Sequence, residues 1–579
     1  MLEKLIFLYG EEKAKEVEKK LKKIIDEVKA KIVCEDRAFW DEKDIFLITY
    51  ADSFQEIDSG QVFRQVFDRE AQTESAQDTK QSRSARMTTS VTLKTLSKFL
   101  DLHLKGAISG VHILPFFPYS SDRGFSVMDY NQVKKEFGSW GDVQEIGKNY
   151  RLMADLVLNH VSVKHDWFQK FLAGDEKYWN YFIHFEKSNI PHEALKKVFR
   201  PRFTSLLSPF QTARGERWVW TTFSVENSTD QVDLNYHNPE VLIEIIRVLL
   251  NLLAKSIRVF RLDAVAYIWK KLGTDCKNLP EGHAVVSLFR NILDLVCPSA
   301  IIITETNVPY EDNITYFGDG QNESQMVYNF SLPPLILNAF YTGKANHLTS
   351  WAKMLKSSSD KTTFFNFLST HDGIGILGAK GILPENQIEL LLDQIIENGG
   401  KLSERILSTG ERTVYEMNST WWSALNRKDE MFESAFQKFL TSIAICLALA
   451  GVPALYYHLF FGTENNLEGY KKTRIKRDIN RKNLNLHQLE KILANKETKE
   501  IKVFSAVCKI LRTRSLNSAF HPNSKQEILE LDNRIFAVLR GEDEDRVLAL
   551  HNVSRQKVEV KFEDKTYVLE PYGFKWVSL

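Results

Sequence analysis

The chain alternates between short apolar runs and longer stretches with helical periodicity. Short apolar runs bounded by polar residues are typical of strands buried in a parallel sheet. Eight such runs lie at 45–50, 111–115, 151–160, 256–263, 301–305, 325–329, 364–368 and 453–457. Between them the chain returns to helical spacing of apolar residues, as in Val91 to Leu104. Repeated strand and helix units predict an α/β fold.

Three segments depart from this pattern. Gly10 to Lys31 is rich in Lys and Glu, with apolar residues three and four apart, which predicts an amphipathic helix. From about Phe520, short alternating runs separated by Asp, Asn and Gly turns predict a small antiparallel β domain. Ser53 to Ser90 is polar and has little periodicity. We expect it to be an insertion without regular structure, an active lid being the alternative.

The run at 256–263 ends in two charged residues, Arg261 and Asp263. Side chains two residues apart in a strand point to the same face, so a guanidinium and a carboxylate would stand side by side. In a barrel of strands and helices, catalytic residues lie at this carboxyl end of the strands. The pair is therefore a candidate for catalysis, with a purely structural ion pair as the alternative.

Three other runs also end in polar clusters, at Asn159-His160, at Glu305 and at His371-Asp372. Together with Arg261 and Asp263, and in this order, they resemble the four signature regions of the α-amylase superfamily of retaining α-glucosidases and α-glucosyl transferases. The resemblance implies a (β/α)8 TIM barrel with a small domain inserted after the third strand. The expected parts are an N-terminal helical cap (1–44), the barrel (45–161 and 237–519), the inserted domain (162–236) and a C-terminal antiparallel β domain (520–579).

Cleavage of an α-glucosidic bond with retention needs one ionised and one protonated carboxyl group. The resemblance implies that Asp263 is the nucleophile, Glu305 the acid/base, and Asp372 a third carboxylate that binds sugar hydroxyls. We expect the charge of Arg261 to keep the pKa of Asp263 low. Glu305 follows four uncharged residues and would keep its proton where its surroundings exclude water.

Further motifs resemble the sucrose phosphorylase group of this superfamily. They are Phe116-Phe-Pro, Ser121-Asp-Arg-Gly-Phe125, Phe199-Arg-Pro-Arg202, Ser331-Leu-Pro-Pro-Leu335, Thr370-His-Asp-Gly-Ile374-Gly375, Tyr415-Glu-Met-Asn-Ser-Thr420 and Arg477-Asp-Ile-Asn-Arg481. The likeness implies that Asp122 and Arg514 close a pocket for one sugar, with Arg512 as the alternative arginine. The expected sugar-binding residues are then Asp122, His160, Arg261, His371 and Arg514.

A phosphorylase admits phosphate where a hydrolase admits water, and arginine suits oxyanions because its planar fork binds two oxygens. Arg200 and Arg202 are therefore candidate phosphate ligands, with surface ion pairing as the alternative. The stretches 268–271, 306–320 and 415–418 resemble glucosylglycerate phosphorylases. That resemblance implies an acceptor site with Tyr415 and Asn418, and an acceptor loop at 399–412 whose cations hold the glycerate carboxylate.

The sequence thus favours a retaining phosphorylase that moves an α-glucosyl group between a small acceptor and inorganic phosphate, giving α-D-glucose 1-phosphate. D-glycerate is the expected acceptor, with glycerol, fructose or a sugar phosphate left open. The alternatives are a sucrose or sucrose 6-phosphate phosphorylase and a plain α-glucoside hydrolase. A non-catalytic scaffold is a further alternative, against which the intact set of three carboxylates argues.

Composition limits the partners. Lys and Arg number 76 against 75 Asp and Glu, so the net charge of +1 favours neither nucleic acid nor an anionic membrane. We expect no cofactor, no metal and a monomer or homodimer. The five cysteines, Cys34, Cys276, Cys297, Cys446 and Cys508, are widely spaced and without CxxC pairs, which predicts reduced thiols in a cytoplasmic protein. The apolar stretch 439–461 is broken by Gly451 and Pro453, so we expect a buried helix, a turn and a strand.

Overall fold

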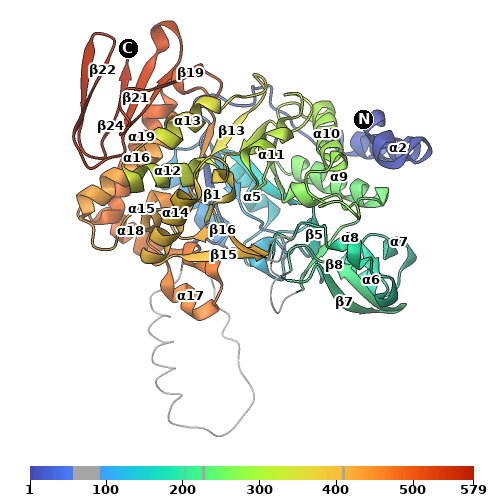
Figure 1. The fold of residues 1–579 in the computed structure, drawn as a ribbon. Helices are drawn as coiled ribbons and strands as arrows, with labels where there is room; N and C mark the ends of the chain where they lie inside the picture. Colours follow the sequence, from blue (N-terminus) through green and yellow to red (C-terminus); the bar gives the residue numbers. More distant parts are fainter. Residues whose placement is uncertain (57–90, 203, 225–228, 407–410) are drawn as a thin grey trace.

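Eight parallel strands form a closed barrel at the centre of the molecule (Figure 1). The computed structural model describes residues 1–579 apart from 57–90, 203, 225–228 and 407–410. In chain order the strands are β1 (Phe46–Thr49), β3 (Gly110–Ile113), β4 (Arg151–Val157), β10 (Ile257–Asp263), β11 (Ile301–Thr304), β12 (Met326–Tyr328), β13 (Thr363–Asn366) and β17 (Val452–Tyr456). Each of the eight apolar runs overlaps one of these strands, and the predicted (β/α)8 barrel is confirmed.

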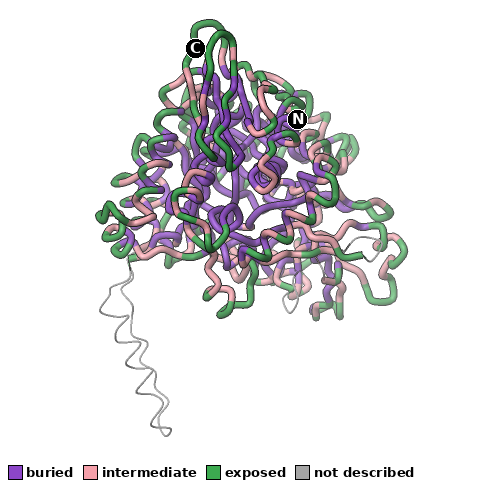
Figure 2. The backbone as a smooth tube through the Cα atoms, turned by 60° about the vertical axis from the view of Figure 1, so that its left-hand side comes forward, coloured by how far each residue is buried: buried purple, intermediate pink, exposed green. Residues whose placement is uncertain are grey.

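The strands are buried on both faces because helices cover the barrel, and the tube in Figure 2 is buried at its centre. These helices include α9 (Pro239–Ala254), α10 (Pro280–Val296), α12 (Leu332–Thr342) and α16 (Phe432–Ala448). Proline in the first turn of α9, α10 and α12 fixes a backbone angle that suits a helix start. The stretch 439–461 forms the end of α16, a turn and β17, as predicted. Among the described helices, none has the length and apolar character that a membrane crossing requires.

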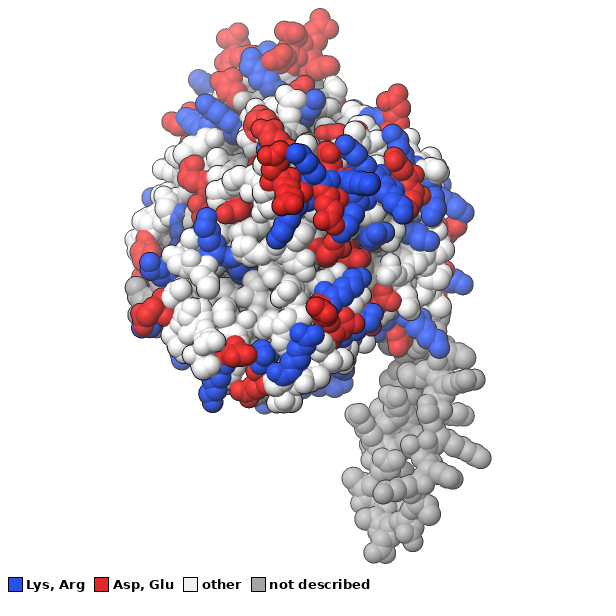
Figure 3. Space-filling model, turned by 90° about the vertical axis from the view of Figure 1, so that its right-hand side faces the viewer, with Lys and Arg blue, Asp and Glu red and all other residues white. Residues whose placement is uncertain are grey.

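Two helices precede the barrel, α1 (Leu2–Tyr9) and α2 (Glu11–Lys29). The apolar face of α2, with Val17, Leu21 and Ile24 buried, packs against α9 and α10. Its Lys and Glu side chains lie outside, on a side of the molecule where basic and acidic groups are interspersed (Figure 3). The helix predicted from the spacing of apolar residues is thus present.

Between β4 and β10 the chain leaves the barrel and forms a small sheet with short helices (Figure 1). The elements of this excursion are β5 (His160–Ser162), α6 (Asp166–Leu172), α7 (Glu176–Trp179), β6 (His184–Phe185), α8 (His192–Leu195), β7 (Leu207–Thr212), β8 (Gly215–Trp220) and β9 (Gln231–Asp233). Strand β8 pairs with β6 and β7, whereas β9 pairs with β5. The β5–β9 pair therefore joins the start of the excursion to its end, directly after the carboxyl end of β4.

After the barrel the chain forms two antiparallel sheets, as predicted. One contains β19 (Gln526–Leu529), β20 (Ile535–Arg540), β21 (Val547–Asn552) and β24 (Phe574–Ser578), and the other contains β22 (Val558–Phe562) and β23 (Lys565–Leu569). Of the polar stretch from Ser53 to Ser90, residues 57–90 lie outside the described residues. The short strand β2 (Phe54–Gln55) at its start pairs with β18 (Leu484–Asn485).

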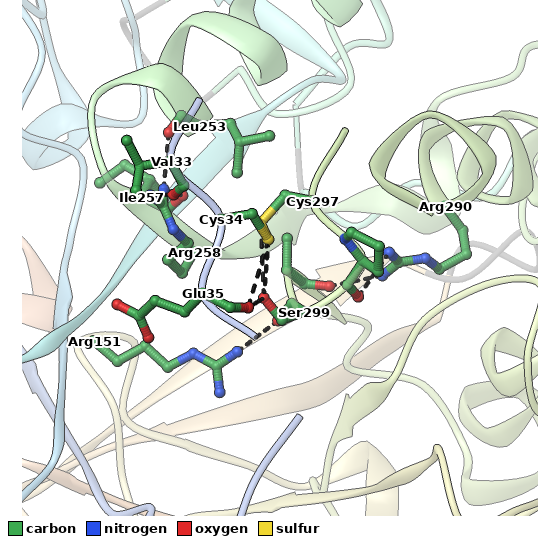
Figure 4. Close-up of a disulfide and its surroundings, with 12 residues drawn as sticks. Val33, Cys34, Glu35, Arg151, Leu253, Ile257, Arg258, Arg290, Cys297 and Ser299 are labelled. Atoms are coloured by element: carbon green, nitrogen blue, oxygen red, sulfur yellow. Dashed lines mark hydrogen bonds between the residues drawn. A yellow bond between two sulfur atoms is a disulfide. The ribbon is translucent and has the colours of Figure 1, made fainter. Parts of the chain in front are cut away.

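A disulfide joins Cys34, in the segment between α2 and β1, to Cys297 directly after α10 (Figure 4). Their Cα atoms lie 5.2 Å apart although 263 residues separate them in sequence. The prediction of five reduced thiols is therefore wrong, because wide spacing along the chain says nothing about proximity after folding. Ser299 Oγ donates to the carbonyl of Glu35 at 2.9 Å and so holds the two segments together beside the disulfide. The remaining cysteines, Cys276, Cys446 and Cys508, are buried free thiols.

Candidate active site

Arg261 lies at the centre of the polar side chains that gather at the carboxyl ends of the strands. Its Nη1 donates to Asp155 on β4 and, at 2.8 Å, to Oδ1 of Asp263. Its Nη2 lies 3.6 Å from Oε2 of Glu305, which follows β11. Residues 261 and 263 share one face of β10, as the spacing of two predicted. The structure therefore brings two of the three predicted catalytic carboxylates onto one buried guanidinium.

The turn after Asp263 aims a backbone donor at Glu305. Ala264 has a φ of 52°, in the left-handed region that non-glycine residues rarely adopt. In this conformation its N–H donates to Oε2 of Glu305 at 3.3 Å. A strained residue between the two acids is typical of a functional site, because the surrounding structure must hold it in place.

Burial dominates the electrostatics of this acid pair. It raises the pKa of Asp263 to about 8, outweighing the opposing charge of Arg261. Burial also raises the pKa of Glu305 against the same charge. The prediction of a low pKa for Asp263 is therefore wrong, because it counted the neighbouring cation and omitted the loss of water around the carboxyl. Such coupled acids share one proton near neutral pH, and the closer contact of Arg261 with Asp263 favours the proton on Glu305.

Asp372 follows β13 and is held by the two arginines of the motif 477–481, for which we predicted no role. Its Oδ1 lies 2.8 Å from Nη1 of Arg477 and 3.6 Å from Nη2 of Arg481. Burial raises the pKa of Asp372, but the charges of Arg477, His371 and Arg481 together bring it below its ordinary value. Asp372 is therefore ionised at neutral pH. The signal for both arginines was their spacing of four in Arg477-Asp-Ile-Asn-Arg481, which lets one turn of chain present both to the same carboxylate.

Arg477 is itself fixed by Glu416 on β16 (Arg412–Asn418). Its Nε and Nη2 donate to the two oxygens of Glu416 at 3.1 and 2.8 Å. Asn418 supports this pair, since its Nδ2 donates to Glu416 at 2.6 Å and to the carbonyl of Asp372 at 3.0 Å. Asn418 is fully buried behind Asp372. Asn418 therefore supports Glu416 and Asp372 from behind. The prediction that Asn418 contacts the acceptor is wrong, because its side chain points into this network.

Asp122 lies at the site, but the arginine nearest to it is not the one predicted. Its Oδ1 is 3.8 Å from Nη1 of Arg481, and Gln231 donates to its Oδ2 at 3.4 Å. Arg514 lies in α19 (Lys499–Ser515) and is fully buried at the opposite end of the barrel. There it donates to backbone carbonyls of Glu42, Leu447, Gly451 and Phe520. The alternative Arg512 is exposed on the same helix. The prediction that Arg514 lines the sugar pocket is wrong. Arg514 lies on the inward face of its helix, and backbone carbonyls accept the hydrogen bonds of its guanidinium.

His160 and His371 both lie at the site as neutral rings. Nε2 of His160 donates to the carbonyl of Phe125 at 3.1 Å, and the ring of His371 stacks on Phe125 with centroids 5.0 Å apart. Burial lowers the pKa of His160 to about 4 and that of His371 below its ordinary value. Nδ1 of His371 has no partner among the described residues. Nδ1 of His371 is thus available to a neutral hydroxyl group, whereas Nδ1 of His160 already accepts from Nδ2 of Asn159 at 3.3 Å.

A cavity of about 100 Å³ opens beside Glu305 and Asp372. Its other lining residues include Arg202, Tyr267, Asn307, Tyr415 and, from β15 (Lys401–Ile406), Arg405. Nη1 of Arg202 donates to the hydroxyl of Tyr415, and the guanidinium of Arg405 lies 4.6 Å from the ring centre of Phe199. In the part of the chain that is described, Nε of Arg202 and Nε of Arg405 have no hydrogen-bond partner and neither guanidinium has an ion pair. Arg200, the other predicted phosphate ligand, is not among the described residues that line this cavity.

The residues that the structure describes contain no group of three or more His, Cys, Asp or Glu side chains placed to hold a metal ion. The side-chain oxygen of Asn159, which follows β4, accepts a hydrogen bond from a lysine ammonium group. Lys270 Nζ donates to Oδ1 of Asn159 and lies near Oδ2 of Asp233, both at 2.6 Å. This buried ammonium ties the end of β9 to the end of β4.

Comparison with known proteins gives consistent results. The profile of the alpha-amylase catalytic domain matches residues 50–383. The chain is 40% identical over its whole length to proteins named glucosylglycerate phosphorylase from Spirochaeta thermophila and Allomeiothermus silvanus, of which it covers 93% and 98%. It is 30% identical to the sucrose phosphorylase of Streptococcus mutans, over 82% of this chain and 94% of that one. The crystal structure of sucrose 6F-phosphate phosphorylase from Thermoanaerobacter thermosaccharolyticum is similar with a TM-score of 0.74 and 25% identity, covering 91% of this chain and 98% of that one.

Proposed function

The chain belongs to the alpha-amylase family, and we propose that it is a retaining glucosylglycerate phosphorylase, which transfers an α-glucosyl group between D-glycerate and inorganic phosphate. One observation carries the proposal. A network of paired acids and arginines borders a cavity whose other side presents Arg202 and Arg405 without ion-pair partners among the described residues. The names of the relatives that match the whole chain at 40% identity support the same acceptor.

In the first step, the ionised carboxylate of Asp263 attacks the anomeric carbon of the donor sugar. The bond from that carbon to the glycerate oxygen breaks, and Glu305 gives its proton to this oxygen. The products are glycerate and a β-linked glucosyl ester on Asp263. Arg261, at 2.8 Å from Asp263 and 3.6 Å from Glu305, steadies the negative charge that the pair keeps through this exchange.

In the second step, a phosphate oxygen attacks the same carbon from the face that glycerate left. The ester bond to Asp263 breaks, and the carboxylate of Glu305 takes the proton of the incoming hydrogenphosphate, which restores the acid form of Glu305. Two inversions give α-D-glucose 1-phosphate with net retention. Arg202 and Arg405 bind the oxyanion in this step, since planar guanidinium groups suit phosphate and carboxylate oxygens alike.

The sugar itself is bound by groups whose charges are already paired within the protein. Asp372 pairs with Arg477 and Arg481, and Asp122 lies near Arg481. Nδ1 of His371 and Nη2 of Arg481 have no hydrogen-bond partner among the described residues. Such atoms can bond neutral hydroxyl groups without leaving an unpaired charge, which fits a hexose on this side.

The test is a panel of acceptors incubated with α-D-glucose 1-phosphate and scored by release of inorganic phosphate. We expect glycerate to release phosphate faster than glycerol, fructose or fructose 6-phosphate. In the opposite direction, glucosylglycerate should yield glucose 1-phosphate only when phosphate is present. Release of free glucose at the same rate without phosphate would instead identify a hydrolase.

Two variants separate the chemistry from background. Asp263→Asn should lower every transfer rate by about 10⁴-fold or more, because no covalent ester can form. Glu305→Gln should slow turnover similarly yet still form the ester from a donor whose leaving group needs no proton. Intact mass spectrometry would then detect one added glucosyl unit on Glu305→Gln and none on Asp263→Asn. An ester on the Asp263→Asn variant would contradict the assignment of the nucleophile.

A further inference from the structure

The loop that carries Asp122 holds three consecutive residues in the left-handed region. Asp122, Arg123 and Gly124 have φ angles of 49°, 48° and 116°. A side chain at Gly124 would meet the carbonyl oxygen of Pro115 at 2.3 Å, so glycine is required there. Asp122 and Arg123 carry side chains and adopt this conformation only where the surroundings enforce it. The loop from Ser120 to Ser126 therefore needs an anchor.

Asp230 anchors the loop through hydrogen bonds to its first residues. Its carboxylate accepts hydrogen bonds from the hydroxyls of Ser120, at 2.6 Å, and Ser121, the two residues that directly precede Asp122. Its other oxygen accepts from the Ser162 hydroxyl at 2.9 Å and from the N–H of Val163 at 3.3 Å. All four donors are neutral, and bonds from such donors to a carboxylate are stronger than bonds between neutral groups.

Nothing in the proposed chemistry accounts for this carboxylate. Among the described residues, Asp230 has no Lys, Arg or His within ion-pair distance, and it does not line the cavity beside Glu305. It stands at the end of the excursion from the barrel, directly before β9. The next residue, Gln231, donates to Asp122 at 3.4 Å. Asp230 and Gln231 thus contact both the base of the loop and the carboxylate that the loop presents.

The loop also supplies a second group to the site. The carbonyl of Phe125 accepts from His160 at 3.1 Å, and its ring stacks on His371. Ser121 Oγ lies 2.7 Å from Ser126 Oγ, which links the two ends of the loop. A shift of the Ser120–Ser121 base would therefore move Asp122 away from Arg481 and disturb both histidine rings.

We infer that Asp230 is a positioning residue, which holds the strained loop 120–126 in the shape that places Asp122 against the bound sugar. It touches neither sugar nor phosphate and acts through Asp122 and Phe125. The inserted excursion between β4 and β10 thereby sets the geometry of the sugar pocket as well as bordering it. The inference concerns the same site as the proposed function and rests on it for its assay.

The test is a double-mutant cycle on the full chain with Asp230→Ala, Asp122→Ala and the pair. We expect Asp230→Ala to lower kcat/KM for glucosyl transfer by about 10- to 100-fold, since small misplacements of a binding group have effects of this order. In the Asp122→Ala background the same change should lower kcat/KM by about threefold or less, because Asp230 acts mainly through Asp122. Asp175→Ala, which removes an N-cap of α7 in the same excursion, is the matched control and should leave kcat/KM within twofold.

Equal losses in both backgrounds would overturn the inference, because they would indicate a general structural role. Loss of less than twofold in the single Asp230→Ala variant would overturn it as well. Where Asp230→Ala does not fold, Ser121→Ala removes one of the four contacts and takes its place in the cycle. Absence of transfer activity in the unchanged enzyme would contradict the proposed function. Binding of α-D-glucose 1-phosphate to the same variants, measured by calorimetry, would then still decide the inference by the same non-additivity.

Discussion

The sugar side and the acceptor side of the active site differ in how their charges are matched. On the sugar side, Arg261 contacts Asp155, Asp263 and Glu305, and a second cluster joins Asp372 to two arginines. On the acceptor side, Arg202 and Arg405 line the cavity without an ion pair in the described part of the chain. Both sides leave single hydrogen-bonding atoms free, but only the acceptor side leaves whole charges unmatched.

The difference shows what each side is built to hold. A buried network in which every charge has a partner can bond neutral hydroxyls, but its carboxylates would repel a further anion. Unmatched guanidinium groups beside the catalytic acids attract an anion and are stabilised by it. The two sides also come from different parts of the fold. Barrel strand ends and the segment 477–481 carry the charged groups of the sugar side, whereas Arg202 of the excursion and Arg405 on β15 supply the guanidinium groups of the acceptor side.

The largest effect that tests the sugar side is expected from Arg481→Ala. Arg481 contacts both Asp122 and Asp372, so its loss should lower kcat/KM by about 10²- to 10³-fold, the scale of a lost charged contact in the transition state. The folding stability should change little relative to this loss. Steady-state kinetics together with thermal unfolding would measure both quantities.

Arg514→Ala is the matched control for this prediction, since both arginines are buried. It removes four hydrogen bonds to carbonyls at the far end of the barrel and should lower the free energy of unfolding by about 3 kcal/mol. Its kcat/KM at low temperature should stay near that of the unchanged enzyme. A larger rise in KM for Arg514→Ala than for Arg481→Ala would reverse our placement of the two residues.

The acceptor side is tested by Arg202→Ala and Arg405→Ala. Each should raise KM for phosphate and for glycerate and lower kcat/KM by about 10- to 100-fold, because each removes a charge-assisted contact. Transfer of the glucosyl group to water should be nearly unchanged, since water carries no charge. Arg200→Ala is the control from the same Arg-Pro-Arg run and should leave all three rates within twofold. Equal losses for phosphate and water would show that these arginines serve the sugar side.

The same division explains which parts of the site could be predicted from the sequence. Asp263, Glu305 and Asp372 each follow an apolar strand, and the ends of parallel strands meet by geometry alone. Arg514 and Asn418 could not be placed in this way. The direction of a side chain on a helix or a hairpin depends on what packs against it. The motif at 477–481 contains Arg481, the arginine that lies near Asp122 and Asp372, and its spacing of four from Arg477 was the available signal.

The predictions for the pKa of Asp263 and for the cysteines were wrong because both depend on which groups lie close together after folding. The pKa of Asp263 depends on how much water reaches the carboxyl, and sequence showed only its charged neighbour at 261. The disulfide between Cys34 and Cys297 depends on the packing of the N-terminal segment beside α10, which a separation of 263 residues conceals. Strand positions, in contrast, follow from local apolar pattern, and all eight were predicted.

The pH dependence of kcat/KM distinguishes the nucleophile Asp263 from the acid Glu305, with a smaller expected effect than the arginine variants. Burial raises the pKa of Asp263 to about 8 and raises that of Glu305, so the pair keeps one proton at neutral pH. As the pH rises through the raised pKa values of the pair, this proton is lost, Glu305 can no longer protonate the leaving oxygen, and kcat/KM should fall about tenfold per pH unit. Glucosyl fluoride, whose leaving group needs no proton, should show a much weaker decline. A decline of equal steepness with both donors would place the titrating group elsewhere.

The smallest effect on either side is expected from loss of the disulfide. Cys297 lies directly after α10 and only a few residues before β11, the strand that leads to Glu305, yet the bond itself sits with Cys34 outside the active site. Cross-linking across a long loop acts chiefly on the unfolded chain, so Cys34→Ser should lower the free energy of unfolding by about 2–5 kcal/mol. The kcat/KM for glycerate and for phosphate should both stay within twofold below the melting temperature.

Reductant should shift the melting temperature of the unchanged enzyme but not of the variant, and alkylation under denaturing conditions without reductant should label only Cys276, Cys446 and Cys508. A loss of activity confined to one substrate would instead mean that the N-terminal segment helps to hold that side of the site, and the division between the two sides would have to be redrawn.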